Sequence, residues 1–421
     1  MREITPRPPV HAVVRIPGSK SITHRALIAA GLADPESLIE NFLACEDTLY
    51  TANALGAMGA GISIHGTDVS VSGTGGNIKE VSGKKEIFLG NSGTSYRLLL
   101  SLAALGRGEY IFTCGSRMGQ RPVGDLVKAL GELGVETSFI QKQGYPPVSV
   151  KGSGIRGGNI RIPGNISSQY ISSILLSGPY AEEKVEIEVT GNLVSRSYID
   201  LTLDVMGTFG IHVDRDEYRS FRVGVGEKYR PCRFGIEGDV SSASYFWGAA
   251  AVTGGRVVTE NIHPFATRQG DIALLDILEE MGCHVEKQDD RVMVEGRALS
   301  GIEADMGAMP DMVPTLAAVS LFAEGETVIR NVSHLRYKES DRLGDTAHEW
   351  RILGGRVEEL EDGLVIHGGR RLKGAVVDPH DDHRLAMSLA IIGLRAAGVR
   401  IRDEHCVEKS FPSFWKLWDT L

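Results

Sequence analysis

Several features that would place this sequence quickly in a class of protein are missing from it. No apolar run reaches the roughly 20 residues that a membrane helix needs. The first residues, MREITPRPPV, lack the apolar core and cleavage signal of a secretory leader. The five cysteines are scattered without a CxxC pair, so neither a structural zinc site nor a disulfide framework is expected. These absences predict a cytoplasmic protein that does not enter a membrane.

An excess of positive charge is also absent. The 45 Lys and Arg residues against 54 Asp and Glu residues give a net charge of −9. Because a dedicated nucleic-acid binder is usually basic, no nucleic-acid partner is expected. A local cationic pocket for a small anion remains compatible with this balance.

The composition is that of a folded protein of more than one domain. Hydrophobic residues make up 42% of the 421 residues and charged residues 24%, which permits a sizeable core. At roughly 150 residues per domain, the length predicts two or three domains. The 51 glycines exceed the usual share and indicate many tight turns or close approaches of the backbone to ligands.

A first sequence pattern recurs along the chain: an amphipathic stretch, then a glycine, then residues that alternate in polarity as in a strand. Its copies are ALGAMGAGISI, ALGELGVETSF, DVMGTFGIHV, DILEEMGCHV and EWRILGGRVEE. The pattern predicts a helix closed by a glycine and followed by a strand. The marker glycines, spaced by 75, 76, 72 and 72 residues, are Gly59, Gly134, Gly210, Gly282 and Gly354.

A second sequence pattern occurs in six copies that alternate with the first. It predicts a strand, a small polar turn, an apolar helix and another strand. Examples are RIPGSKSITHRALIAAGLA and VDPHDDHRLAMSLAIIGLRAAGVRI. Alternation of strands and helices predicts an α/β fold built from six units. The sixth unit ends before its closing strands, and the strand around 10–16 is expected to supply one. We therefore expect two domains of three units each, a discontinuous one of residues 1–18 plus 239–421 and an inserted one of residues 19–238.

The polar turns of the second sequence pattern are the candidate functional positions. Each turn enters a helix N-terminus, where backbone N–H groups and the helix dipole favour anions. Any single turn is also what an ordinary N-cap looks like. Cations recur, however, in three of the six turns, as Lys20 with Arg25, as Arg97 and as Arg384. This recurrence predicts a site for phosphates and carboxylates.

Two other matches are rejected. The GxGxxG match at 152–157 precedes a strand (IRIPG) instead of a helix, so it lacks the context of a dinucleotide-binding turn. His380 and His383 frame two aspartates, but no further ligand cluster supports a metal there. We expect neither a metal nor a cofactor.

Six segments, GSKSITHRAL, GNSGTSYR, MGQRPVGDL, SSQYISSILL, YKESDR and DHRLAM, occur in this order. Together they resemble the EPSP synthase family of enolpyruvyl transferases, over nearly the whole chain. The resemblance implies an inverse α/β barrel-like fold of two domains, each of three βαβαββ repeats, with the active site in the cleft between them.

The implied reaction transfers the enolpyruvyl group of phosphoenolpyruvate to the 5-hydroxyl of shikimate-3-phosphate and releases phosphate through a tetrahedral intermediate. It would belong to the shikimate pathway of aromatic amino-acid biosynthesis, the target of the herbicide glyphosate. The chemistry needs an acid near the methylene carbon, a base near the hydroxyl, and cations around the leaving phosphate. The partners implied are these two small anions, and the protein is expected to be a monomer.

The resemblance also implies roles for individual residues. The expected catalytic residues are Asp311 as base, Glu339 as proton donor with Lys20 assisting, and His383 close to the intermediate. Phosphoenolpyruvate would be bound by Lys20, Asn91, Gly93, Arg121, Arg342, Arg384 and Lys409. Shikimate-3-phosphate would be bound by Lys20, Ser21, Arg25, Thr94, Ser167, Ser168, Gln169, Ser195, Tyr198, Asp311, His334 and Lys338.

The second turn departs from the commoner family pattern, GNAGTAMRPL. Ser92, Ser95, Tyr96 and Leu98 are the differences, so glyphosate sensitivity does not follow from the resemblance. His334 stands where Asn is frequent. Two alternatives stay open at this point: a UDP-N-acetylglucosamine enolpyruvyl transferase with Cys114 as its reactive thiol, and a repeat-built ring that grips a polyanion, which the acidic net charge opposes.

Overall fold

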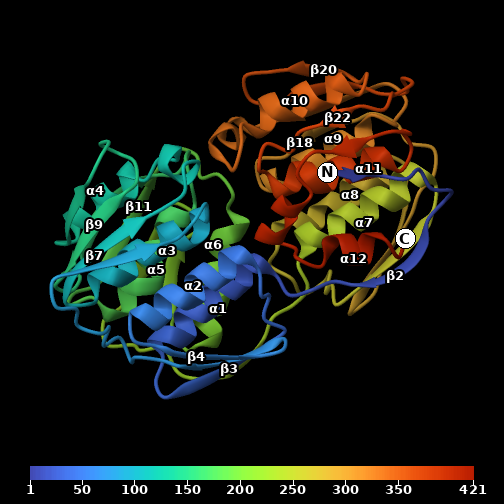
Figure 1. Cartoon of the computed structure of the whole chain (residues 1–421). Helices are drawn as coiled ribbons and strands as arrows, with labels where there is room; N and C mark the ends of the chain where they lie inside the picture. Colours follow the sequence, from blue (N-terminus) through green and yellow to red (C-terminus); the bar gives the residue numbers. More distant parts are fainter. The chain divides into compact units, whose positions relative to one another are not determined.

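A computed structural model describes residues 1–421 of the chain. The chain forms two compact units (Figure 1). The split unit consists of Met1–Pro17 and Glu237–Leu421, and the inserted unit is Gly18–Ile236. The chain therefore passes from one unit to the other twice, after Pro17 and after Ile236.

The inserted unit contains three four-stranded sheets, each accompanied by two helices. The first has strands β14 (Arg233–Gly235), β3 (Glu36–Glu40), β5 (Asp68–Ser72) and β4 (Gly61–His65), with helices α1 (Lys20–Leu32) and α2 (Glu46–Ala57). The second has β6 (Lys84–Phe88), β7 (Gly108–Thr113), β9 (Val148–Gly152) and β8 (Glu136–Phe139), with α3 (Gly93–Ala104) and α4 (Gly124–Glu132). The third has β10 (Gly158–Pro163), β11 (Val185–Thr190), β13 (Ser220–Val223) and β12 (Val213–Asp216), with α5 (Gln169–Ser177) and α6 (Ser197–Thr208).

The split unit repeats this plan with a shorter last member. Its first sheet has β2 (His11–Arg15), β15 (Arg256–Glu260), β17 (Arg291–Glu295) and β16 (His284–Lys287), with α7 (Val240–Thr253) and α8 (Leu274–Glu280). The next has β18 (Glu303–Asp305), β19 (Glu326–Arg330), β21 (Leu364–His367) and β20 (Arg356–Glu359), with α9 (Val313–Ser320) and α10 (Arg342–Ile352). The last has three strands, β22 (Val376–Val377), β23 (Arg400–Ile401) and β1 (Arg2–Glu3), with α11 (His383–Gly393) and α12 (Phe414–Trp418).

Short 3-10 helices occupy six of the connections. They are η1 (Met118–Gln120), η2 (Gly178–Tyr180), η3 (Gly270–Ala273), η4 (Pro310–Met312), η5 (Ser333–Tyr337) and η6 (His405–Lys409). None of the helices combines the length and the apolar character that crossing a membrane requires.

The predicted α/β fold of six units is confirmed. In each four-stranded sheet the first two strands pair in parallel and the others antiparallel, as the βαβαββ order requires. The five marker glycines follow the second helix of their repeats. All have positive φ, from 85° at Gly210 to 116° at Gly282. This backbone region is one that L side chains rarely adopt, which explains the recurrence of glycine there.

The expectation for the strand around 10–16 was wrong. It does not complete the sixth unit: β2 pairs in parallel with β15 in the fourth sheet, and the shorter β1 joins β23 in the sixth. Likewise β14, which leads into α7, pairs with β3 in the inserted unit. Each crossing of the chain thus leaves a strand in one unit and its following helix in the other. Two asparagines secure the ends of these strands, because Asn261 Nδ2 donates to Ile16 O and Asn41 Nδ2 donates to Ile236 O.

The first helices of the repeats form the centre of each unit. In the inserted unit α1, α3 and α5 pack against one another, and in the split unit α7, α9 and α11 do so (Figure 1). Residues Val240–Thr253 of α7 and His383–Gly393 of α11 are buried along their whole length. A helix that is apolar on all sides belongs in a core. Because each of these helices follows a polar turn, packing them together gathers the turns at one end of the unit.

Candidate functional site

The inserted unit gathers predicted residues at the start of its helices. We call Lys20, Arg25, Asp47, Arg97, Arg121 and Gln169 the Lys20 cluster. Lys20 begins α1, and its Nζ lies 3.1 Å from Asp47 Oδ2 in the first turn of α2. The side chain of Lys20 is 12% exposed and that of Asp47 2%. This ammonium group is therefore held in place at a helix N-terminus, where it can also contact an anion.

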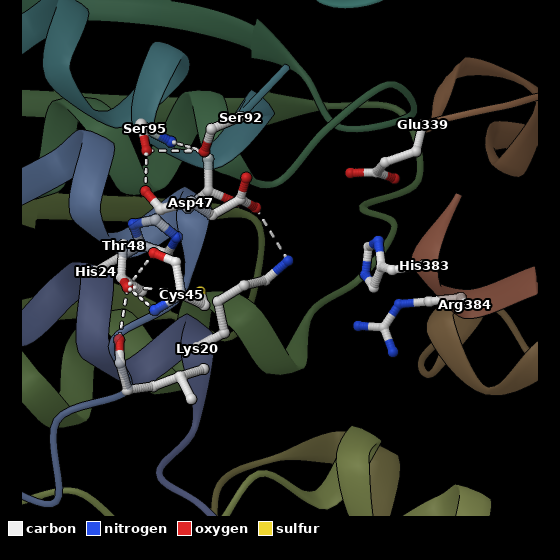
Figure 2. A network of polar contacts seen from close by, with 12 residues as sticks. Lys20, His24, Cys45, Asp47, Thr48, Ser92, Ser95, Glu339, His383 and Arg384 are labelled. Atoms are coloured by element: carbon white, nitrogen blue, oxygen red, sulfur yellow. Dashed lines mark hydrogen bonds and ion pairs between the residues drawn. The ribbon is translucent and has the colours of Figure 1, made fainter. Parts of the chain in front are cut away.

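A buried chain of hydrogen-bonded hydroxyl groups ends at the backbone carbonyl of Asp47 and holds this residue in place (Figure 2). Ser95 Oγ donates to the Asp47 carbonyl at 2.9 Å, and Thr51 Oγ1 donates to Ser95 Oγ at 2.9 Å. His24 Nδ1 lies 2.8 Å from Thr51 Oγ1, and Ser92 Oγ lies 2.8 Å from Ser95 Oγ. Ser92 and Ser95 are two of the departures from the commoner family pattern. Here they connect the start of α3 to the start of α2.

Arg25 lies beneath the start of α1 and is 1% exposed. Its Nε donates to Thr202 Oγ1 at 2.7 Å, and its Nη atoms donate to the carbonyls of Ser21 and Tyr198. These partners are neutral, so burial lowers the pKa of Arg25 to about 10. The side chain remains a cation at neutral pH, and it retains N–H donors beyond the three in use.

Arg97 and Gln169 connect the starts of α3 and α5. Arg97 Nη1 donates to Gln169 Oε1 at 2.9 Å and to Ser167 Oγ at 3.4 Å, and Gln169 Nε2 donates to Thr94 Oγ1 at 3.0 Å. The structure therefore brings these predicted residues together. Ser168 and Ser195 are also buried, and Ser195 has a φ of 54°.

The requirement for Gly93 has a direct steric cause. A Cβ atom at this position would lie 2.5 Å from Nη1 of Arg121, which is itself 4% exposed. Asn91 Oδ1 accepts a hydrogen bond from the Met118 amide, which fixes the loop that carries Arg121. A larger residue at 93 would displace this guanidinium group.

In the split unit a second group of charged residues surrounds one arginine. We call Asp311, Lys338, Glu339, Arg342, Asp382 and Arg384 the Asp311 cluster. Arg342, 1% exposed, donates to Asp382 at 2.7 Å, to Asp311 at 2.9 Å and to Glu339 at 2.8 Å. Burial alone would lower the pKa of Arg342, but these three carboxylates outweigh burial and raise it.

Asp311 lies in η4, just before α9, and faces three cations. Arg384 Nη2 is 2.7 Å from its Oδ2, while Arg342 Nη1 at 2.9 Å and Lys338 Nζ at 3.7 Å face its Oδ1. Burial acts to raise the pKa of Asp311, but the combined positive charges hold it well below its usual value. Asp311 is consequently a carboxylate at neutral pH.

The remaining predicted residues of the split unit lie at or near the ends of α11, η5 and η6. His383 begins α11 and is 1% exposed, with Nδ1 3.8 Å from Asp382 Oδ1. Burial and then Lys338 lower the pKa of His334 to about 4, so this side chain is neutral at pH 7. Lys409 ends η6 and is buried.

The sequence interpretation missed two residues that organise these clusters. Asp382 is fully buried and accepts from Arg342 Nε and Nη2, from Ser340 Oγ and from the Arg384 amide. Asp47 pairs with Lys20 as described. Both are first-turn or N-cap carboxylates, which a sequence shows only as ordinary caps. The signal available was their position just before or within predicted helix starts.

Two other candidate chemistries gain no support from the structure. Cys114 directly follows β7, and burial raises the pKa of its thiol to about 11, which disfavours the reactive thiolate. No group of three or more His, Cys, Asp or Glu side chains is placed to hold a metal ion.

One unit thus holds buried cations at helix starts, and the other holds carboxylates interleaved with arginines, which are the side chains that an enzyme acting on small anions needs. The chain belongs to the EPSP synthase (3-phosphoshikimate 1-carboxyvinyltransferase) family, whose sequence profile matches residues 4–418. It is 47% identical over 409 residues to the 3-phosphoshikimate 1-carboxyvinyltransferase of Methanoculleus marisnigri, covering 97% of this chain and 96% of that protein. The Syntrophobacter fumaroxidans protein of the same name is 44% identical, covering 100% and 99%. The solved structure of EPSP synthase from Acinetobacter baumannii matches with a TM-score of 0.82 at 29% identity, covering 99% of this chain and 97% of that one.

Proposed function

We propose that this chain transfers the enolpyruvyl group of phosphoenolpyruvate to the 5-hydroxyl of shikimate-3-phosphate and releases phosphate, in agreement with its membership of the 3-phosphoshikimate 1-carboxyvinyltransferase family. The supporting observation is Asp311, a carboxylate held between Arg342, Arg384 and Lys338. A charged carboxylate that can accept the proton of a hydroxyl, set among cations that bind anionic substrates, is what this reaction requires.

In this proposal the inserted unit supplies most of the anion contacts. Two donors of Arg25 and the Ser21 hydroxyl bind the shikimate carboxylate, and Gln169 contacts the ring beside Tyr198. The substrate phosphate is bound by Ser167, Ser168, Ser195 and Lys338, with Thr94 and His334 adjoining. The transferring phosphate is bound by Lys20, Arg121 and Lys409, with Asn91 and Gly93 lining its loop.

The Asp311 cluster supplies the proton transfers. Glu339 acts in its protonated form and gives a proton to the methylene carbon of phosphoenolpyruvate, while Asp311 takes the proton of the attacking hydroxyl. The resulting tetrahedral intermediate then breaks down: the methyl group returns a proton to Glu339, the enol ether double bond re-forms, and the leaving phosphate takes up the proton held by Asp311. Lys20 and His383 stabilise the charges that develop in these steps.

The ion pairs of Asp311 link substrate binding to its strength as a base. Arg342 and Arg384, the proposed ligands of the phosphoenolpyruvate carboxylate, both contact Asp311. A second carboxylate on the same guanidinium groups adds negative charge beside Asp311 and draws cationic charge away from it. Its pKa then rises, and Asp311 becomes a stronger base once phosphoenolpyruvate is bound.

The test is phosphate release from phosphoenolpyruvate with either shikimate-3-phosphate or UDP-N-acetylglucosamine as acceptor. We expect turnover with shikimate-3-phosphate and none with the sugar nucleotide. Turnover with the sugar nucleotide, together with inactivation by a thiol reagent, would identify the other enolpyruvyl transferase. Release with neither acceptor would contradict both assignments.

We further propose that each compact unit acts as one domain and that the protein is a cytoplasmic monomer. All five cysteines are free thiols, which fits a reducing compartment. Light scattering on the purified chain tests the monomer, and a dimeric mass would contradict it.

A further inference from the structure

The buried carboxyl group of Asp271 lies near the Asp311 cluster and has no role in the proposed reaction. Asp271 is in η3, between β15 and α8, and is 5% exposed. No lysine, arginine or histidine forms an ion pair with it. Its side chain accepts a hydrogen bond from the hydroxyl of Ser241, in the first turn of α7. A buried carboxyl group without a cationic partner is costly, so its retention needs an explanation.

The Ser241 hydroxyl also faces the Asp311 cluster. Arg384 Nη2 donates to Ser241 Oγ at 3.4 Å and to Asp311 Oδ2 at 2.7 Å. A serine hydroxyl has one proton and two lone pairs. When that proton is donated to Asp271, the lone pairs of Ser241 remain for the guanidinium group. The contacts therefore run in one line, from Asp271 through Ser241 and Arg384 to Asp311.

We propose that Asp271 is a positioning residue for the enolpyruvyl transfer: through the Ser241 hydroxyl it fixes the Arg384 guanidinium group against Asp311. Asp271 touches neither substrate in this role. The inference rests on the proposed function, because Arg384 and Asp311 matter only if that reaction occurs.

The electrostatic surroundings give this line of contacts a pH dependence. Burial first, and then the negative charge of Asp311, raises the pKa of Asp271 to about 7. Arg384 from α11 and the Ser241 hydrogen bond act in the opposite direction, while Asp239 at the start of α7 adds to the rise. Ionisation of Asp271 near neutral pH adds a negative charge to the group that accepts the Ser241 hydrogen bond. That charge polarises the Ser241 hydroxyl and strengthens the hydrogen bond that it accepts from Arg384, so Arg384 is held more firmly in its position beside Asp311.

The test is Asp271→Asn, which keeps the side-chain shape and removes the charge. We expect the KM for phosphoenolpyruvate to rise about tenfold, the effect of losing roughly 1.4 kcal/mol of binding. The KM for shikimate-3-phosphate stays unchanged, because Arg384 does not bind that substrate in our proposal. The kcat profile between pH 6 and 8 loses one ionisation. The matched control is Asp276→Asn on α8, whose carboxylate is 66% exposed in a surface ion pair with Lys287.

A second variant separates positioning from a fault in folding. Ser241→Ala breaks the same line of contacts at another point, so it should also raise the KM for phosphoenolpyruvate. The double variant with Asp271→Asn should raise this KM no more than the larger of the two single effects. Additive losses, or a folded Asp271→Asn enzyme with wild-type KM and pH profile, would overturn the proposal. If the wild-type chain releases no phosphate at all, the proposed function fails. Crystal structures of wild type and Asp271→Asn then decide the inference, and an unchanged contact between Arg384 and Asp311 rejects it.

Discussion

The Lys20 cluster and the Asp311 cluster both bury arginines at helix starts, but they surround them with different partners. In the inserted unit Arg25 donates to hydroxyl and carbonyl oxygens, and burial lowers its pKa to about 10. In the split unit Arg342 faces three carboxylates, which raise its pKa despite equal burial. The two arginines are equally buried, so the charge of their partners decides whether the pKa is lowered or raised.

This difference separates two tasks. A cation among neutral partners keeps its field for an incoming anion, which suits the binding of phosphate and carboxylate groups. A cation among carboxylates holds those carboxylates in fixed positions and influences which of them carries a proton, which suits proton transfer. We therefore expect changes in the Asp311 cluster to alter turnover and stability strongly, and changes in the Lys20 cluster to alter substrate affinity.

The largest expected effect is on turnover. Glu339→Gln removes the proposed proton donor, and we expect kcat to fall by about 10²–10⁴-fold, the usual contribution of a positioned acid, while substrate binding persists. The matched change in the other unit, Ser167→Ala, removes one hydrogen bond to a charged group. It should raise the KM for shikimate-3-phosphate about tenfold with little loss of kcat. Steady-state kinetics distinguish the two, and full turnover by Glu339→Gln would remove it from its role.

The next effect is on folding. Arg342→Met removes the buried cation that Asp311, Glu339 and Asp382 share and leaves the fully buried Asp382 without its ion pair to arginine, so we expect a loss of about 3–5 kcal/mol in the free energy of unfolding. Arg25→Met leaves neutral acceptors unsatisfied but also removes a buried charge, so its cost should be smaller, about 1–3 kcal/mol. Urea unfolding measures both. Equal losses would show that the partners' charges do not distinguish the two clusters.

A pH dependence of stability follows from Asp271. Its pKa is about 7 in the folded protein against 3.8 for the ordinary side chain, so the folded state keeps a proton that the unfolded state releases. The contribution of this bound proton to the free energy of unfolding is fully present below pH 3.8, declines as the pH rises, and is lost near pH 7. It amounts to about 4 kcal/mol at most. Asp271→Asn should flatten this part of the stability curve and Asp276→Asn should not. An unchanged slope would place the pKa of Asp271 near its ordinary value.

The smallest expected effect concerns the hydroxyl chain beside Lys20. Ser95→Ala removes the donor to the Asp47 carbonyl and the acceptor for Thr51, and it should cost about 1 kcal/mol of stability. Because Lys20 keeps its ion pair with Asp47, kcat should change little. A loss of turnover comparable to that of Glu339→Gln would mean that this neutral network controls chemistry as the charged one does.

Much of this molecule is predictable because its repeats are local. The six polar turns, the helices after them and the five closing glycines follow from short-range patterns, and the structure has them all. The pairing of β2 was not predictable in this way, because a strand's edge partner depends on contacts between residues more than 240 positions apart. Asp47, Asp271 and Asp382 were missed for a related reason. Each reads locally as a cap or loop carboxylate, and only the packing of distant helices brings it to a cation or hydroxyl.

The exchange of strands at the two crossings has a consequence for how this gene could be divided. A fragment ending at Ile236 keeps β2 but lacks β15, its only neighbour in the sheet, while the complementary fragment exposes the bare edge of β15. Neither piece is therefore a self-sufficient module, and the two should be recovered as active protein only when they are produced together. A version with its original ends joined and new ends opened at a distant surface turn would keep both strands in place.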